Sequence, residues 1–156
     1  MNIELSKVII RDAVAGDLHA LLEFEQGVLT AERPFDPTLR AKTTYYDLEV
    51  MLASENVKLL VAELNNKVIG SGCVRIEESK RYNKHSHHAY FGFMYVLPEY
   101  RGKGVNGKLI EQLRQWAKSK GITEMRLLVY YNNTNAIKAY EKCGFSQLMI
   151  EMRGDI

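Results

Sequence analysis

The sequence predicts an α+β protein of mixed α/β type, in which helices flank a central mixed β-sheet in the order βααβββαβαβ. Apolar residues recur at helical spacing in four segments, and β-branched and aromatic residues gather between them. A strand–turn–helix–strand stretch over residues 90–131 supplies one parallel crossover. With 156 residues, of which 46% are hydrophobic, the chain can bury one sizeable core. We therefore expect a single domain covering residues 1–156.

The N-terminal third predicts one strand and two helices. Residues 8–11 read as a short strand, and Asp17 is the expected N-cap of the helix that follows. Pro34 and Pro37 then interrupt the chain, because proline cannot continue a helix or donate to a sheet. After this break, Thr44 is the expected cap of a second helix.

In the middle of the chain, the sequence predicts a hairpin followed by a long aromatic strand. Strands at residues 57–64 and 68–76 are joined by an Asn-Asn-Lys turn, a composition typical of tight hairpins. The polar residues 77–88 are predicted to be a loop. The strand at residues 90–97 is aromatic-rich and ends at Pro98.

The C-terminal third predicts alternating helices and strands. Apolar residues at helical spacing indicate a helix from about Val105, followed by a strand over residues 125–131. A helix is expected over residues 134–143, with Gly144 as its left-handed cap. A final strand is predicted at residues 146–152.

The octapeptide Arg-Gly-Lys-Gly-Val-Asn-Gly-Lys, at residues 101–108, is predicted to bind phosphate. It lies between a strand and a helix, and its three glycines let the backbone approach a ligand closely. Free backbone amides at the beginning of a helix, together with the helix dipole, favour an anion there. The ligand should therefore carry phosphate.

Two nucleotide-binding patterns also fit this stretch in part. Gly102, Gly104 and Gly107 match the dinucleotide fingerprint, which needs an acidic residue at the end of the next strand. Glu124 has about the right spacing but lies at the beginning of that strand. The P-loop pattern needs a hydroxyl side chain for magnesium where this chain has Leu109. Both readings lack a residue that their chemistry requires.

A third pattern, [Q/R]-x-x-G-x-[G/A], is met by Arg101 and Gly104, with Asn106 at its last position. A second block over residues 133–145 combines an Asn, Ala-Ile, Tyr-Glu-Lys and Gly-Phe. Together the two blocks resemble the GNAT superfamily of acetyl-CoA-dependent N-acetyltransferases, most strongly over residues 90–145. Asn106 departs from the pattern, but asparagine tolerates the backbone conformations that glycine adopts more easily.

The resemblance implies transfer of an acetyl group from acetyl-CoA, the acyl donor, to a primary amine of a small molecule or peptide. It implies direct attack of the amine in a ternary complex. By position, the residues implied to contact the donor are Met94, Val96, Arg101, Gly102, Lys103, Gly104, Val105, Asn106, Gly107, Lys108 and Asn133. Backbone groups of Met94 and Val96 would bond the pantetheine arm, as in an added strand. Asn133 could instead be a helix N-cap.

Tyr140 stands where the family places the general acid that protonates the departing thiolate. A phenol with a reference pKa of about 10 can donate a hydrogen bond without being ionised at neutral pH. Its spacing from Ile137 also suits simple packing in the core. If Tyr140 has only a packing role, the alternative function is a non-catalytic acyl-CoA-binding module that regulates a partner.

The acceptor side is less specified, because Tyr90 stands where some family members carry a catalytic Glu. Side chains that could act there as a base or as a wall are Glu25, Phe35, Asp36, Glu77, His88 and Tyr90. Phe35 and Asp36 belong to a proline-stiffened segment at the family's usual specificity region. These residues do not identify which amine is the acceptor.

Charge and composition limit the classes of molecule that the protein is expected to bind. The net charge is only +2, which does not favour general attraction to nucleic acid or membranes. Residues 1–78 carry a net −5 and residues 79–120 a net +7, which suits a cationic acceptor and an anionic donor. The same distribution is also compatible with an ordinary solvated surface.

Cysteine and histidine usage suggests a reduced, metal-free protein. Cys73 and Cys143 lie far apart in the sequence, as expected of buried thiols in a cytoplasmic protein. His85, His87 and His88 do not share one strand face, so no metal site is expected. The chain has little room for a further strand after residue 152, and a homodimer partner is one way to supply it.

Overall fold

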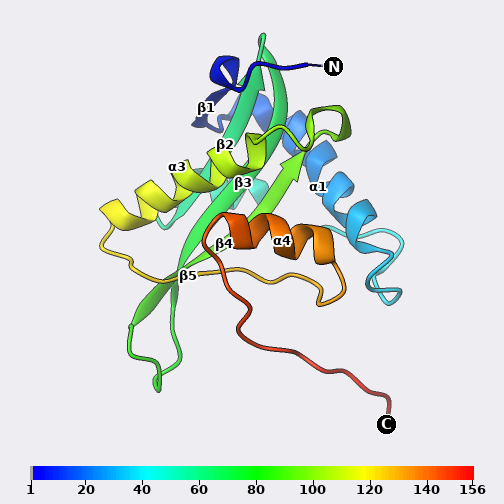
Figure 1. The fold of residues 1–156 in the computed structure, drawn as a ribbon, viewed down its shortest axis with the longest axis vertical. Coiled ribbons are helices and arrows are strands. Elements are labelled where there is room, and N and C mark those ends of the chain that lie inside the picture. The colour runs from blue at the N-terminus through cyan, green and yellow to red at the C-terminus, as the bar shows by residue number, and fades with distance from the viewer. Residues whose placement is uncertain (1) are drawn as a thin grey trace.

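The computed structural model describes residues 2–156, which contain a five-stranded sheet in the order β1-β2-β3-β4-β5 (Figure 1). The strands are β1 (Ile9–Asp12), β2 (Val57–Leu64), β3 (Lys67–Glu78), β4 (His87–Val96) and β5 (Met125–Arg126). Neighbouring strands are antiparallel except for β5, which runs parallel to β4. The predicted mixed sheet and its parallel crossover are therefore confirmed.

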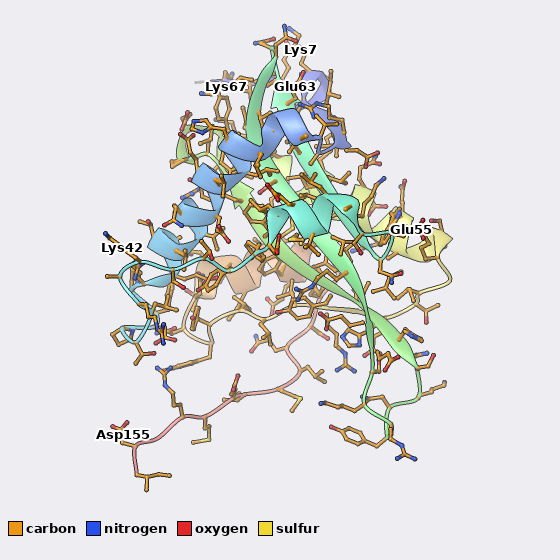
Figure 2. The ribbon with its side chains drawn as sticks, turned by 180° about the vertical axis from the view of Figure 1, so that it is seen from behind. Lys7, Lys42, Glu55, Glu63, Lys67 and Asp155 are labelled. Atoms are coloured by element: carbon orange, nitrogen blue, oxygen red, sulfur yellow. The ribbon has the colours of Figure 1, made fainter. Side chains whose placement is uncertain are left out.

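Helices cover both faces of this sheet. The helices α1 (Leu18–Glu32) and α2 (Leu48–Ala53) pack on one face, while α3 (Val105–Ser119) and α4 (Thr134–Lys142) pack on the other. Figure 1 shows α3 and α4 in front of the sheet, and Figure 2, seen from behind, shows α1 and α2 in front of it. No helix within residues 2–156 is long and apolar enough to cross a membrane.

Strand β4 contributes to both halves of the core. Ala89 and Phe91 pack with α3, whereas Phe93 packs with Cys73 and residues of α1 and α2. Regular alternation would place these three odd-numbered side chains on one face, but the register shift opposite Phe93 and its φ of +53° turn this residue to the other face. Beyond Tyr90, the edge of β4 that faces away from β3 has no partner strand within residues 2–156.

At the beginning of two helices, the capping interaction differs from the one predicted. Asp17 stands at the N-cap position of α1, but its carboxylate binds the guanidinium of Arg11 and accepts from the amide of Val14. The second helix begins after Asp47, not Thr44, because the Asp47 carboxylate accepts from the amide of Val50. The Asn65-Asn66 turn is confirmed, with both residues at positive φ.

Strands β3 and β4 extend into the predicted polar loop, which shrinks to residues 79–86. Glu77 pairs with His88, and Glu78 with His87, across the two strands. Cross-strand hydrogen bonding continues at these polar positions because one face of the sheet is exposed there. The Gly144 cap is confirmed by its φ of +94°.

The predicted final strand at residues 146–152 is wrong. Residues after 145 form no helix or strand, and Figure 1 shows this segment running away from the sheet. Its apolar side chains Leu148 and Ile150 are 73% and 78% exposed. The predicted strand at 125–131 is also shorter than expected, so β5 offers little edge for another strand to pair with.

Candidate active site

Strand β4 continues beyond its pairing with β5, and we call the unpaired edge of β4 beyond Tyr90 the opening. The two strands pair only at Ala89 with Met125 and at Tyr90 with Arg126. Beyond that point β4 continues to Val96 without a partner on this side. Residues of one parity, including Met94 and Val96, therefore direct backbone groups toward the opening. This is the geometry that a ligand needs to bind as a partial extra strand.

Strand β4 is irregular at Phe93, beside the opening. The register shifts between Ser71 and Cys73, and Phe93 adopts a φ of +53°. The Ser71 hydroxyl donates to the carbonyl of Phe93, and the amide of Phe93 donates to the hydroxyl of Tyr46 at 3.2 Å. A left-handed residue costs about 1–2 kcal/mol outside glycine. Two side chains thus hold a bulge that re-aims the strand backbone beside the opening.

The predicted phosphate turn has the required backbone conformation. Gly102 and Gly104 have φ values of +70° and +86°, and α3 begins at Val105 directly afterwards. In the described residues, the amides of 102–107 have no backbone partner outside the helix, whereas the amide of Lys108 donates to Gly104. Free amides at a helix start, together with the helix dipole, favour an anion at this position.

Two basic side chains of the turn are already engaged. The Arg101 Nε donates to the carbonyl of Val96 at 2.7 Å, and its guanidinium lies 5.3 Å from the centre of the Tyr95 ring. The Lys108 ammonium donates to the carbonyls of Leu5 and Val8. Lys108 therefore ties α3 to the N-terminal segment, and Arg101 lies against the end of β4.

Helix α4 brings Tyr140 to the other side of the opening. Its ring packs edge-on against Phe145, which in turn packs on Phe91 of β4. Burial, with a smaller contribution from the charge of Glu32, raises the pKa of Tyr140 to about 12. The Tyr140 hydroxyl has no hydrogen-bond partner in residues 2–156 and is protonated at neutral pH. It is a free donor.

Asn133 caps α4, which is the alternative noted for this residue. Its Oδ1 accepts from the amide of Ala136 at 3.3 Å. The side-chain nitrogen has no partner within residues 2–156, so it can still donate to a ligand in the opening.

The predicted acceptor-side residues do not all lie together. Tyr90 faces the α1 side, beneath the guanidinium of Arg75, and burial raises its pKa. His88 is nearly buried, with its Nδ1 2.8 Å from the Ser79 hydroxyl and its Nε2 3.6 Å from Glu77. Glu77 also forms an ion pair with Arg75. His88 and Glu77 therefore form a polar cluster next to the loop that joins β3 and β4.

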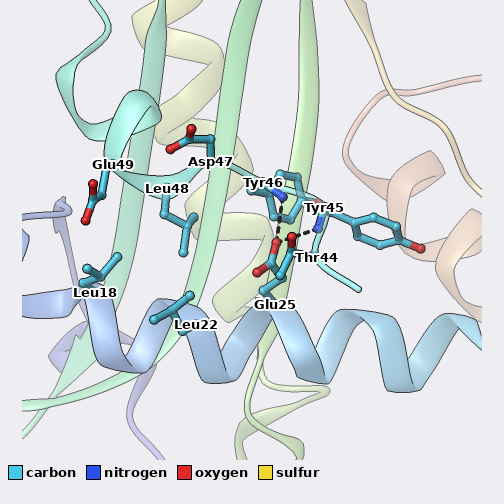
Figure 3. A pocket seen from close by; sticks show the side chains of 9 residues that line it. All are labelled: Leu18, Leu22, Glu25, Thr44, Tyr45, Tyr46, Asp47, Leu48 and Glu49. Carbon is cyan, nitrogen blue, oxygen red and sulfur yellow. Dashed lines mark hydrogen bonds between the residues drawn. The ribbon is translucent and has the colours of Figure 1, made fainter. Parts of the chain in front are cut away.

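Glu25 holds the chain before α2. It is fully buried, and its Oε2 accepts from the amides of Tyr45 and Tyr46, each at 2.7 Å (Figure 3). Its Oε1 has no partner in the described residues. The carboxylate borders a cavity of about 520 Å³ between α1 and α2. The principal contact of Glu25 is therefore with the backbone that positions two tyrosines.

Phe35 and Asp36 lie at the far end of α1, beside the chain that follows β5. Phe35 stacks on Tyr130 with 5.9 Å between ring centres. Asp36 accepts from Thr38 and forms an ion pair with Arg153 from the C-terminal segment. These contacts hold the pKa of Asp36 well below its usual range. The predicted specificity segment thus joins three distant parts of the chain.

Sequence reasoning missed several residues whose contacts join the end of α1 to the chain before α2, to β4, to the chain after β5 and to the C-terminal segment. They are Glu32, Tyr45, Tyr46, Tyr130 and Arg153. The sequence held one signal for the first of them. Glu25 and Glu32 are seven residues apart and fall on the apolar stripe of α1, where a carboxylate is unexpected. The tyrosines and Arg153 come from separate segments and gave no such pattern.

No group of three or more His, Cys, Asp or Glu side chains in residues 2–156 is arranged to hold a metal ion. The Cys73 thiol is buried, and burial raises its pKa to about 12. It is therefore a protonated core residue, as expected for a thiol in an apolar environment.

The family and the curated relatives that this sequence resembles are acetyltransferases. Residues 21–145 match the Acetyltransferase (GNAT) family. An acetyltransferase of Yersinia pestis is 30% identical over 129 residues, which cover 79% of this chain and 81% of the relative. A thialysine N-epsilon-acetyltransferase of Bos taurus is 37% identical over 59 residues, which cover 38% of this chain. That match spans only 35% of the relative's length.

The fold comparison agrees with the sequence comparison. A predicted acetyltransferase of Clostridium acetobutylicum, crystallised with acetyl-CoA, superposes with a TM-score of 0.70 at 21% identity, covering 94% of this chain and 96% of the other. The family match covers both predicted blocks and most of the sheet. The chain therefore belongs to the GNAT family of acetyltransferases.

Proposed function

We propose that the protein is an N-acetyltransferase that transfers the acetyl group of acetyl-CoA to a primary amine. Three features together support the proposal: β4 has an unpaired edge beyond β5, the amides of residues 102–107 have no backbone partner outside the helix, and the protonated Tyr140 hydroxyl has no partner in residues 2–156. They suit a long ligand with phosphate at one end and a leaving thiolate at the other. Acetyl-CoA has that chemistry.

The donor would be held mainly by backbone groups. The amides of 102–107 would bind its pyrophosphate, with Lys103 adding positive charge. The edge of β4 at Met94 and Val96 would bind the pantetheine amides. Arg101 lies on the Val96 carbonyl, so it would share that oxygen with the ligand or turn toward a phosphate. The side-chain nitrogen of Asn133 is a further donor.

The amine would attack the thioester directly. A covalent acyl-enzyme needs an activated nucleophile, and the raised pKa of Cys73 and its burial argue against one there. Tyr90 is also a poor base at neutral pH, because its raised pKa keeps it protonated. An alkyl amine is only about one part in a thousand neutral at pH 7, a penalty of about 4 kcal/mol. Deprotonation therefore falls to water or to a carboxylate of the acceptor side.

Tyr140 would stabilise the departing thiolate. Its pKa of about 12 exceeds the reference pKa of a thiol, about 8.5, so complete proton transfer would cost about 5 kcal/mol. A hydrogen bond from the phenol to the developing negative charge has no such cost and strengthens as the charge grows. Tyr140 is thus proposed as a hydrogen-bond donor in the transition state.

Thermal unfolding tests the donor site. At about 100 times its Kd, acetyl-CoA should add about 2.7 kcal/mol and raise the Tm by about 5–10 °C. In Gly104→Ala the stabilisation should fall by about half, because the substitution strains a residue with φ +86° and brings a methyl group 3.0 Å from Leu5. The measurement is the Tm with and without acetyl-CoA for each variant.

Gly121→Ala is the matched control. Gly121 has a φ of +78°, lies just beyond the other end of α3, and has no atom within 4 Å of an added Cβ. It should lose comparable stability while keeping the full acetyl-CoA shift. Stabilisation of the wild-type protein by NAD or by ATP with magnesium, and not by acetyl-CoA, would contradict the donor assignment.

A further inference from the structure

Glu32 ends α1 at the point where several segments of the chain meet. Its Oε2 accepts a 2.6 Å hydrogen bond from the hydroxyl of Tyr45, which precedes α2. Three residues later, Phe35 stacks on Tyr130, which follows β5. The Glu32 carboxylate therefore lies among the chain before α2, the chain after β5 and the end of α1.

The negative charge of Glu32 reaches the hydroxyls around the opening. Burial is the largest cause of the raised pKa of each nearby tyrosine, and the charge of Glu32 contributes in every case. The tyrosines affected are Tyr45, Tyr46, Tyr90, Tyr130 and Tyr140. They come from the chain before α2, from β4, from the chain after β5 and from α4. The Glu32 carboxylate thus acts electrostatically on hydroxyls from four segments of the chain, and its direct contact is with Tyr45.

Glu32 is also a carboxylate without a cation. No lysine, arginine or histidine of residues 2–156 forms an ion pair with it. The neighbouring Arg33 instead donates to the carbonyls of residues 39–41. Asp36, the other carboxylate of this segment, is occupied by Arg153. A carboxylate that has no cation and lies beside a tyrosine is a favourable place for an organic cation.

We propose that Glu32 determines acceptor specificity by binding a second ammonium group, so that the preferred acceptor is an aliphatic diamine. One amino group attacks the thioester near Tyr140 while the other remains charged and bonded to Glu32. The Tyr45 hydroxyl holds the carboxylate in place, and the nearby tyrosine faces can contact the methylene chain and the ammonium. This assignment rests on the proposed N-acetyltransferase function and names the acceptor class of the same site.

A matched pair of amines tests it. With saturating acetyl-CoA, kcat/KM is measured for 1,4-diaminobutane and for butylamine, which has the same reactive end without the second charge. We expect the wild-type enzyme to prefer the diamine by at least about tenfold, equivalent to about 1.4 kcal/mol. In Glu32→Gln the preference should disappear through a higher KM for the diamine, while butylamine is used as before.

Two further variants separate charge from structure. Tyr45→Phe removes the hydrogen bond that positions Glu32 but keeps the carboxylate, so the diamine preference should weaken without disappearing. Glu23→Gln removes an exposed carboxylate of α1 that pairs only with His19, and it should behave as wild type. If Glu32 merely anchored the chain before α2, Tyr45→Phe and Glu32→Gln would impair both amines alike.

The possible failures are distinguishable. If the wild-type enzyme acetylates both amines with equal kcat/KM, or if Glu32→Gln keeps the preference, the specificity assignment is overturned and the proposed function stands. If it acetylates neither amine nor any other while acetyl-CoA binds, the proposed function fails and the assignment falls with it.

Discussion

Tyr140→Phe is expected to lower kcat about 100-fold while leaving acetyl-CoA affinity unchanged. Removing one donor to a developing negative charge typically costs a factor of about 10²–10³. The ring remains, so its edge-on contact with Phe145 is kept and the fold should not change. Single-turnover rates and acetyl-CoA titrations together measure the two effects separately.

The pH dependence adds a second readout for Tyr140. Because its pKa is raised to about 12, the hydroxyl is protonated throughout the ordinary assay range. No loss of rate through its ionisation should therefore appear below about pH 11. Tyr82→Phe, in the exposed loop between β3 and β4, is the control and should be silent. Unchanged turnover in Tyr140→Phe would leave the residue with a packing role only.

Among the substitutions proposed here, Glu25→Ala should lower the free energy of unfolding the most. The substitution leaves the amides of Tyr45 and Tyr46 without the acceptor that holds them at 2.7 Å. Unsatisfied amides at a partly buried site should cost about 2–3 kcal/mol in total, or about 4–12 °C in Tm. Activity should fall as well, because a displaced Tyr46 would no longer accept the hydrogen bond from the amide of Phe93 in β4.

Glu25→Gln separates the hydrogen bonds from the charge. The side-chain oxygen of glutamine can still accept from both amides, so we expect a loss below about 1 kcal/mol. Equal destabilisation in the Ala and Gln variants would show that the negative charge, and not the acceptor oxygen, is what the loop requires. Urea unfolding of the three proteins gives the free energies directly.

Local patterns were enough to predict the parts of the site that act through the backbone. The phosphate turn depends on glycines at positive φ followed by a helix, and both features are encoded within residues 101–108. The position of Tyr140 is fixed by the helix that Asn133 begins and Gly144 ends. These elements are short-range, so neighbouring residues determine them.

The strand errors have a physical reason. Residues 125–131 and 146–152 have strand-forming composition, but a strand exists only where a partner offers free backbone groups. The chain after Arg126 diverges from β4, and this divergence both creates the opening and removes the edge that a final strand would need. Composition could not predict this divergence, which is the feature proposed to admit the ligand.

The acceptor side was the least predictable part. Glu32, Tyr45 and Tyr130 are brought together only when α1, the chain before α2 and the chain after β5 pack against each other. Such tertiary contacts leave no regular spacing in the sequence. Of the residues predicted for this side, Phe35 lies in the group, while His88 of β4 and Glu77 of β3 contact each other elsewhere.

The most direct test is to measure thiol release from acetyl-CoA in the presence of a panel of primary amines, with mass analysis of the amines afterwards. The account predicts amine-dependent release of one thiol for each acetylated amine, abolished or strongly reduced in Tyr140→Phe. Tight binding of acetyl-CoA without thiol release for any amine would contradict it and would indicate a non-catalytic acyl-CoA-binding module.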